Sequence, residues 1–305
     1  MDRKDYQYLE VVKTKRRYED TLLLKKGVVG CGVGLDKEGK LGIVIYTSGE
    51  THSIPPELDD INVFTEEVEP DKKWAKEGHI TAVSSQDLEE ITREEKLMKL
   101  HSPNKVDAAV SKPVSLDLVV PEILGLGIPK GTRPACIGMC VRKSGRTTGV
   151  TEGIVLACDV SIFVDYSSMG YGTALFAEQI ATTPMAEPGD SGSLTVDTDL
   201  YAIGLLFAQM TTRTFHNSIQ NVLNTLNIDI LADRVTSEWR KKIAEINREY
   251  RNGKERTERW RPAPMGVSIG HYKGSAGTAG CLVKDKKTGE ILILSNAHVS
   301  AMPIR

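Results

Sequence analysis

Apolar and polar positions alternate differently in successive parts of the chain, and each pattern predicts a different kind of element. Residues 2–26 combine many charges with a partial apolar face, which predicts one or two amphipathic helices. In residues 27–47, two apolar runs flank the turn sequence Asp-Lys-Glu-Gly-Lys, which predicts a hairpin. The glycines of this segment lack the spacing and the following helix of a dinucleotide-binding loop, so we expect them to relieve crowding between strands. A further strand is expected over residues 61–64.

Residues 78–231 are rich in predicted strands. Short apolar segments alternate there with Gly, Pro, Ser and Asp, which favours antiparallel β-barrels over βαβ units. The predicted strands cover residues 118–126, 137–141, 153–157, 160–164, 193–196 and 201–207. A short helix is expected to close this block over residues 215–226.

One surface helix is predicted over residues 236–252. An apolar stripe with the spacing i, i+4, i+7 and i+11 runs along it, formed by Trp239, Ile243, Ile246 and Tyr250. Gly253 is well placed to end this helix. A strand-rich stretch follows, with a hairpin expected between residues 281–283 and 291–294.

The composition is that of a soluble globular protein. The 305 residues suffice for two compact domains or for a double-barrel domain with an appendage, and 40% of them are apolar and 26% charged. The net charge of −2 gives no global electrostatic reason to expect nucleic acid or an anionic membrane as a partner. We therefore expect no nucleic acid and no membrane among the partners.

The five cysteines are odd in number and scattered, which predicts reduced thiols rather than a disulfide framework or a zinc site. The six histidines show no metal-ligand spacing, so no metal and no cofactor are expected. Residues 1–18 lack the apolar core of a signal peptide, and no stretch approaches the roughly 18 apolar residues of a membrane span. These features predict a cytoplasmic location.

The candidate nucleophile is Ser191, within the sequence Glu-Pro-Gly-Asp-Ser-Gly-Ser that begins at Glu187. A serine hydroxyl needs a base to take its proton and donors to stabilise the resulting oxyanion. Small neighbours let the N–H groups of Gly189 and Ser191 point to one spot, where they would form an oxyanion hole. Taken alone, the same sequence also fits a glycine-rich turn before a strand.

His298 and Asp107 are the candidate partners of Ser191. His298 follows a small residue at the end of an apolar strand, and Asp107 lies inside the apolar segment Val-Asp-Ala-Ala-Val. An unpaired carboxylate in such a segment is costly, and an imidazole N–H would satisfy it. Each residue alone also fits a structural role, as a strand-end histidine or as the cap of a turn.

Together these segments resemble the trypsin-like serine peptidases of the chymotrypsin fold, most closely the bacterial intracellular-type members. The likeness rests on TAGCLV and ILSNAHV around His298, VDAAV around Asp107 and PGDSGSL around Ser191. It extends to SGRTTG at residues 144–149 and to AIGLLF at residues 202–207. Three motifs in one chain are far more specific than any one of them.

The resemblance implies an all-β core of two antiparallel barrels, a small N-terminal α/β appendage and an active site in the cleft between the barrels. It implies that Ser191 attacks the scissile carbonyl, that His298 acts as base and then as acid, and that Asp107 orients the histidine. Gly189 and Ser191 would supply the oxyanion hole. Asp190 resembles the aspartate that pairs with a freed N-terminus in processed relatives, although no obvious activation cleavage site accompanies it.

The chain departs from the family in order, because the family runs His, Asp, Ser. Residues 258–305 read as a segment that belongs between Glu69 and Pro70. The predicted units are therefore an appendage over 1–69, a first barrel from 70–129 and 258–305, a second barrel over 130–231 and a bridging helix over 232–257. Three explanations stay open: a natural or engineered permutation within one chain, strand exchange with a neighbouring molecule, and a reordering of the chain as written.

The sequence says little about specificity. The predicted substrate pocket consists of Met185, Phe207, Ala208 and Gln209. None of them is charged, so we expect a medium-sized apolar residue before the scissile bond.

The predicted function is a serine endopeptidase that forms an acyl-enzyme intermediate. Its alternatives are a latent or inactive protease-like scaffold that binds peptides, a peptidase that is inert until residues 258–305 dock, and an esterase. The expected partners are a protein or peptide substrate and, in addition, a strand-exchanged oligomer or an activating partner.

Overall fold

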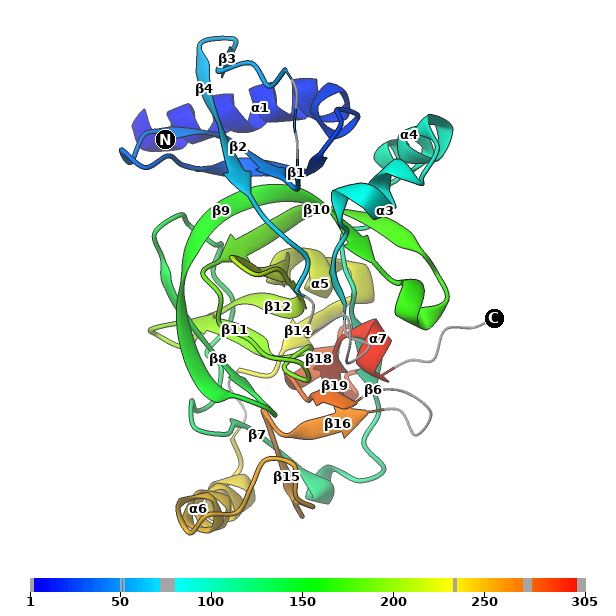
Figure 1. The fold of residues 1–305 in the computed structure, drawn as a ribbon. Coiled ribbons are helices and arrows are strands. Elements are labelled where there is room, and N and C mark those ends of the chain that lie inside the picture. Colours follow the sequence, from blue (N-terminus) through cyan, green and yellow to red (C-terminus); the bar gives the residue numbers. More distant parts are fainter. Residues whose placement is uncertain are drawn as a thin grey trace.

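The structure is a computed structural model that describes residues 3–49, 51, 53–71, 80–232, 235–270 and 276–300. These residues form a mostly β structure with a few helices (Figure 1). The helices are α1 (Arg3–Leu23), α3 (Ser85–Glu89), α4 (Arg93–His101), α5 (Ile219–Leu226), α6 (Ser237–Arg251) and α7 (Ala297–Ser300), with short 3₁₀ helices η1 (Leu116–Leu118) and η2 (Ser167–Met169).

One large sheet of eleven strands contains the Ser191 region. Its strands follow the order β10-β13-β12-β11-β8-β9-β1-β2-β4-β3, with β5 beside β12 and β9. They are β1 (Val28–Leu35), β2 (Leu41–Thr47), β3 (Glu57–Leu58), β4 (Ile61–Glu67), β5 (Thr81–Ala82), β8 (Cys140–Gly145), β9 (Gly149–Asp165), β10 (Thr173–Thr182), β11 (Leu194–Asp197), β12 (Ala202–Gln209) and β13 (Thr214–Ser218). The long strand β9 links this sheet, because it pairs with β8, β1 and β10.

A smaller sheet joins segments that lie far apart in the sequence. Its order is β14-β18-β19-β6, formed by Ile228–Ile230, Cys281–Asp285, Ile291–Ser295 and Ala109–Ser111. Two pairs of short strands lie beside it: β7 (Val119–Ile123) with β15 (Ala263–Met265), and β16 (Ser268–Gly270) with β17 (Ala276–Thr278). The late segment thus forms strands with the segment that follows Asp107.

The N-terminal hairpin predicted over residues 27–47 is confirmed, with Leu35 opposite Leu41. Its strand β1 packs so closely on β9 that a Cβ added at Gly30 would lie 2.5 Å from the side chain of Ile162. The glycine is therefore needed for this close approach. The strands of the predicted appendage continue the large sheet, and α1 covers them (Figure 1).

The helix predicted over residues 236–252 is confirmed as α6. The Thr236 hydroxyl accepts a hydrogen bond from the N–H of Trp239 at its start, and Trp239 and Ile246 are buried. The side chain of Asn247 donates to Glu122 of β7 at 3.0 Å, so α6 packs beside β7.

Several predicted elements were wrong. The stretch expected to be rich in strands contains α3 and α4, because Thr92 and Glu95 form a capping box that starts a helix. The two strands expected over 153–157 and 160–164 are one strand, β9, and the first part of the helix expected over 215–226 is β13. The sheets are not purely antiparallel either, since β2 pairs with β4 and β7 with β15 in parallel. The helices α3, α4 and α7 were not predicted from the sequence.

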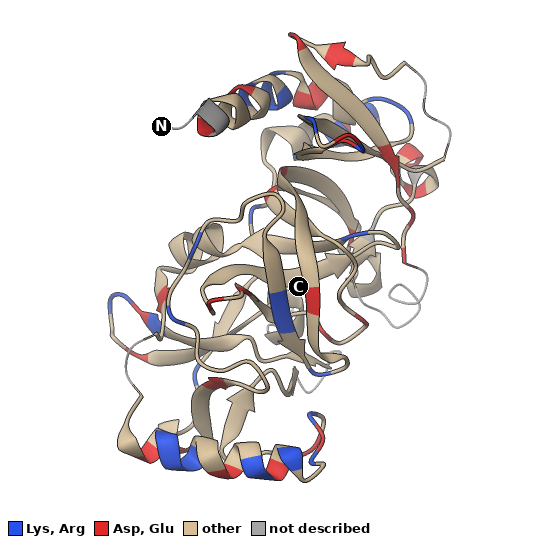
Figure 2. Cartoon of the chain, turned by 90° about the vertical axis from the view of Figure 1, so that its left-hand side faces the viewer, with Lys and Arg blue, Asp and Glu red and all other residues tan. Residues whose placement is uncertain are grey.

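Charged residues concentrate on the helices at the two ends of the molecule, and the strands between them carry few (Figure 2). Among the described residues, no helix combines the length and apolar character needed to cross a membrane.

Candidate active site

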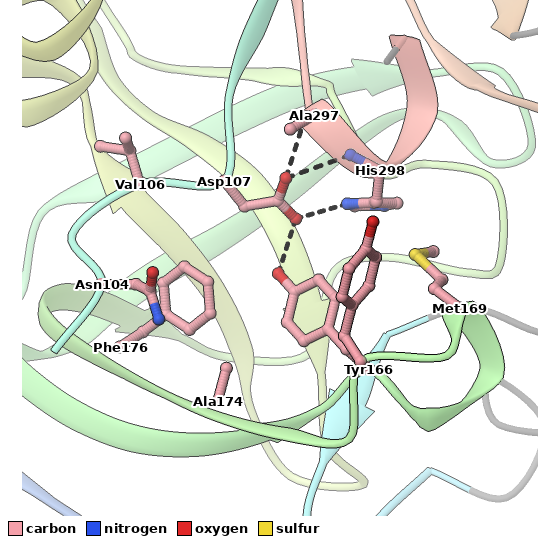
Figure 3. A pocket seen from close by; sticks show the side chains of 10 residues that line it. Asn104, Val106, Asp107, Tyr166, Met169, Ala174, Phe176, Ala297 and His298 are labelled. Carbon is pink, nitrogen blue, oxygen red and sulfur yellow. Dashed lines mark hydrogen bonds and ion pairs between the residues drawn. The ribbon is translucent and has the colours of Figure 1, made fainter. Parts of the chain in front are cut away.

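Asp107 is the centre of a dense hydrogen-bond network (Figure 3). Its Oδ2 accepts hydrogen bonds from His298 Nδ1 at 2.5 Å and from the Tyr166 hydroxyl at 2.8 Å. Its Oδ1 accepts from the N–H of Ala297 at 2.9 Å and from that of His298 at 3.2 Å. Asp107 is 5% exposed, so these four bonds replace the water that would otherwise solvate its charge.

The same contacts explain why α7 begins where it does. The first N–H groups of a helix have no partner within the helix, and a carboxylate satisfies them well. Asp107 takes this capping role for Ala297 and His298, although it comes from a distant part of the chain. The side chain of Asn296 adds a bond of 2.6 Å to the Asp107 carbonyl.

The backbone of Asp107 is also held from the large sheet. Its N–H donates to Asn217 Oδ1 of β13 at 2.9 Å, and Asn217 in turn donates to Gln179 of β10 at 2.7 Å. Asp107 therefore connects the large sheet to the late segment that carries His298.

The positions of the protons on Asp107 and His298 follow from this network. Burial raises the pKa of Asp107, but the charge of His298 and the hydrogen bonds from His298 and Tyr166 outweigh it and hold the pKa below its ordinary value. Asp107 is then a carboxylate and can only accept, so His298 Nδ1 must carry a hydrogen. In the neutral imidazole, Nε2 is left as an acceptor.

Ser191 lies in a tight turn before β11. Gly189 and Gly192 have φ values of +95° and +93°, in the left-handed region that favours glycine. The turn is closed by bonds of 3.0 Å from the N–H of Asp190 to the Glu187 carbonyl and from the N–H of Ser193 to the Asp190 carbonyl. Among the described residues, no backbone hydrogen bond is donated by the N–H groups of Gly189 and Ser191, so both are available to a substrate oxygen.

Asp190 is fully buried and pairs with a lysine inside the protein. Lys143 Nζ lies 2.9 Å from Asp190 Oδ2, and both side chains are 0% exposed. Burial lowers the pKa of Lys143, and the charge of Asp190 opposes this. The carboxylate also accepts from the Thr148 hydroxyl at 2.6 Å and from the N–H of Thr147 at 2.9 Å. The buried charge of Asp190 is thus paired with a cation from within the chain.

Ser191 and the His298 helix meet at β17. The N–H of Thr278 donates to the Ser191 carbonyl at 2.8 Å. A Cβ added at the neighbouring Gly277 would lie 2.8 Å from the Ser191 carbonyl oxygen and 2.4 Å from Val299, the residue after His298. The bare backbone of Gly277 therefore lets the two segments approach each other.

Ser191 Oγ and His298 Nε2 are both buried and have no hydrogen-bond partner, not even each other. A buried polar atom without a partner costs about 1–3 kcal/mol, so such atoms are uncommon. In the described residues they are Ser191 Oγ, Asn296 Oδ1, His298 Nε2, Ser300 Oγ and the Nε atoms of Arg142, Arg146 and Arg213. Four of the seven thus belong to Ser191 and to the segment around His298.

The residues of the predicted substrate pocket are all buried, with exposures of 6% or less. Two of them meet at one hydroxyl, because Thr214 Oγ1 accepts from the N–H of Met185 at 3.0 Å and donates to Gln209 at 2.8 Å. Phe207 packs instead on Phe176, with ring centroids 5.0 Å apart. Ala208 lies in β12 between Phe207 and Gln209.

A cavity of about 320 Å³ lies beside His298 on the side of Tyr166 (Figure 3). Its lining is mostly apolar and aromatic, with Val106, Tyr166, Met169, Tyr171, Ala174 and Phe176 next to Asp107 and His298. None of these six apolar and aromatic residues was predicted as a site residue.

Lys143 and Tyr166 were not predicted as site residues either. A signal for Lys143 existed, because Arg142 and Lys143 are adjacent in a strand and one of two successive side chains must face inward. Tyr166 lies next to a turn with no distinctive sequence, so only the structure reveals its contact with Asp107.

Within the described residues, no cluster of three or more His, Cys, Asp or Glu side chains could hold a metal ion. All five cysteines are free thiols.

No family model and no curated protein matches the sequence. Among solved structures, the chain is similar to a chymotrypsin from Cellulomonas bogoriensis, with 26% identity over 35% of this chain and 56% of that one, at a TM-score of 0.30. A glutamic acid-specific serine protease shares 21% identity over 39% of this chain and 61% of that one, at a TM-score of 0.29. A Nocardiopsis protease (NAPase) shares 16% over 65% and 94%, at a TM-score of 0.27.

These structural neighbours are serine proteases. The chain spans 56% and 61% of the length of the first two.

Proposed function

We propose that this chain is a serine endopeptidase, with Ser191 as nucleophile, His298 as general base and acid, and Asp107 as the group that orients His298. One observation carries the proposal. Ser191 Oγ and His298 Nε2 are buried without partners on two segments that meet at Gly277, while the other nitrogen of His298 is bonded to Asp107.

The reaction follows from these roles. His298 Nε2 takes the proton of the Ser191 hydroxyl as Oγ bonds to the carbonyl carbon of the substrate. The negative oxygen of the tetrahedral intermediate is stabilised by the N–H groups of Gly189 and Ser191. His298 then gives its proton to the leaving amine, the C–N bond breaks and an acyl-enzyme forms. Water attacks the ester by the same route in reverse, with His298 again as the base.

The proposal includes the architecture. The two sheets would close as two barrels with the site between them, and residues 258–305 would complete the first barrel within the same molecule. Support comes from β19, which pairs with β6 shortly after Asp107, and from β15, which pairs with β7. The proposed junction of residue 305 with Pro70 falls partly on residues 301–305 and 72–79, which lie outside the described residues.

The proposed substrate is a peptide with a medium-sized apolar residue before the scissile bond. Support comes from Met185 and Gln209, which flank Thr214 without any charge on their side chains. Profiling with a peptide library tests this, and cuts that follow Arg or Lys would refute it.

The test of the activity is labelling with a fluorophosphonate, which reacts with an activated serine. We expect the wild-type protein to be labelled at every dilution and Ser191→Ala and His298→Ala to lose labelling, with kcat lowered on the order of 10⁶-fold. Ser115→Ala, an exposed serine, is the matched control and should be labelled normally. Labelling that fades on dilution would indicate strand exchange between molecules.

No labelling at any concentration would favour the latent or peptide-binding scaffold. Hydrolysis of esters without hydrolysis of amides would favour an esterase.

A further inference from the structure

Tyr166 contacts Asp107 from a part of the chain that no predicted site residue occupies. It lies at the end of β9, before η2, and its hydroxyl donates to Asp107 Oδ2 at 2.8 Å. The same oxygen accepts from His298 Nδ1 (Figure 3). One carboxylate oxygen therefore receives both a tyrosine hydroxyl and the imidazole.

The ring and the backbone of Tyr166 are both fixed. The ring stacks on Phe176 with centroids 5.9 Å apart and an interplanar angle of 19°, and Phe176 packs on Phe207. The N–H of Tyr166 donates to the Gly172 carbonyl at 2.9 Å, which closes the turn between β9 and β10. The hydroxyl thus has a defined position that does not depend on Asp107.

The hydroxyl of Tyr166 keeps its proton. Burial raises its pKa well above the ordinary value, and the charge of Asp107 adds to this. A protonated phenol beside a carboxylate must donate, and a hydrogen bond to an ionised acceptor is among the stronger kinds.

We propose that Tyr166 is a positioning residue for the Asp107–His298 pair. The N–H groups of Ala297 and His298 hold Oδ1, and the Tyr166 hydroxyl holds Oδ2, so that the carboxylate cannot rotate away from His298 Nδ1. The contacts of Tyr166 with Asp107 do not depend on the proposed function, but the expected effect on catalysis rests on that function.

The variant that isolates this role is Tyr166→Phe. It keeps the ring stacked on Phe176 and removes only the hydroxyl. The matched control is Tyr18→Phe, because the Tyr18 hydroxyl also donates to a carboxylate, Asp59 Oδ1 at 3.0 Å, in the N-terminal region. Both variants lose one tyrosine–aspartate hydrogen bond.

The first measurement is the proton resonance of His298 Nδ1–H, which we expect to lie downfield because this group donates to a carboxylate. It is assigned by its loss in His298→Ala. We expect Tyr166→Phe to shift this resonance and to speed its exchange with water, since Oδ2 becomes free to move. Tyr18→Phe should leave it unchanged.

The second measurement is hydrolysis as a function of pH. We expect Tyr166→Phe to lower kcat about tenfold with KM nearly unchanged, the size expected for a lost hydrogen bond to a charged group. The Tyr166 bond is one of the causes that lower the pKa of Asp107. Without it the carboxylate accepts more strongly from His298 Nδ1–H, so the acid limb of kcat/KM, which the general base sets, should move to higher pH. The titratable groups that line this cavity are Asp107, Tyr166, Tyr171 and His298.

The two proposals fail in different ways. A downfield resonance with the same position and exchange rate in wild type and Tyr166→Phe would overturn the positioning role, whatever the activity. Absence of the resonance from the wild-type protein would overturn it as well. A wild-type protein that shows the resonance and its change in Tyr166→Phe, but is never labelled by fluorophosphonate, would support the positioning role and refute the peptidase.

Discussion

The Ser191 turn and the Asp107–His298 pair are held together in different ways. Lys143 and Thr148 bind the buried Asp190 of the turn across 47 and 42 positions of the sequence. Asp107 and His298 bind each other across 191 positions. The turn is closed by neighbouring strands of the large sheet, whereas the pair exists only when the last part of the chain docks on it.

The Ser191 turn and the Asp107–His298 pair are the two halves of the proposed site, and each can therefore be disrupted without the other. The contacts that shape the turn run through Asp190, and those that orient His298 run through Asp107. The two sets also come together at Gly277 and Thr278 of β17. Substitutions at each of these three places should therefore give three different results.

The largest loss of stability is expected for Lys143→Met, which disrupts the Ser191 turn and leaves the Asp107–His298 pair intact. It leaves the charge of Asp190 buried without its cation, which costs about 3–5 kcal/mol in the free energy of unfolding. We expect fluorophosphonate labelling to fall, while the downfield resonance of His298 remains. Urea unfolding, fluorophosphonate labelling and the His298 proton resonance measure these effects.

Lys13→Met is the control, because Lys13 pairs with Glu10 on the surface and its side chain is 67% exposed. It should change stability little. Equal effects of the two substitutions would show that the buried pair does not hold the turn.

A smaller loss of stability is expected for Gly277→Ala, which changes the contact between the Ser191 turn and the His298 segment. The new methyl group would lie 2.4 Å from Val299 and 2.8 Å from the Ser191 carbonyl oxygen, so one of the segments must move. Overpacking of this kind costs about 1–3 kcal/mol. We expect labelling and the downfield resonance to change together.

Gly34→Ala provides the comparison, since its nearest neighbour would be the Leu156 carbonyl oxygen at 3.1 Å, away from the site. It should leave both assays unchanged. Loss of labelling with an unaltered resonance in Gly277→Ala would contradict the idea that Gly277 contacts both segments.

The smallest effect is expected for the pH dependence of stability in the half that carries Ser191. His216 of β13 lies between the hydroxyls of Thr182 and Thr195, at 3.0 and 2.9 Å. Burial, and then the charge of Lys143, lower its pKa to about 3. The unfolded chain takes up this proton below about pH 6.5 and the folded protein does not, so the free energy of unfolding falls as the pH drops through this window.

The His216 contribution amounts to about 1 kcal/mol between pH 6.5 and 5.5. We expect His216→Gln to flatten the pH dependence of stability in this range, as measured by urea unfolding at several pH values. His101→Gln, at an exposed position of α4, should keep the wild-type slope. An unaltered slope in His216→Gln would show that this histidine is not the group that titrates.

Asp107 adds no pH dependence over the same range. Its pKa is held below the ordinary value of an aspartate, so its stabilising contacts are kept through this window and are lost only as the pH falls through that lowered pKa. Mild acid should therefore weaken the protein through His216 while the Asp107–His298 resonance persists.

Local patterns were sufficient to predict several elements. The turn sequence between two apolar runs identified the hairpin of β1 and β2, and the 3.6-residue periodicity identified α6. The same reasoning failed for α4, where a capping box outweighed the expectation of strands, and for β9, where local bulges bend one long strand without ending it.

Residue types and local patterns were enough to identify the candidate groups: a serine in a Gly-Asp-Ser-Gly segment, a histidine at a strand end and an aspartate in an apolar segment. Long-range packing alone reveals that Asp107 caps the helix of His298, that Lys143 pairs with Asp190 and that Tyr166 reaches the carboxylate. The cause is the distance along the sequence over which each kind of interaction acts. Turn signals, caps and periodicity act within a few residues, whereas a buried charge is satisfied by whichever group the packing of distant strands brings near it.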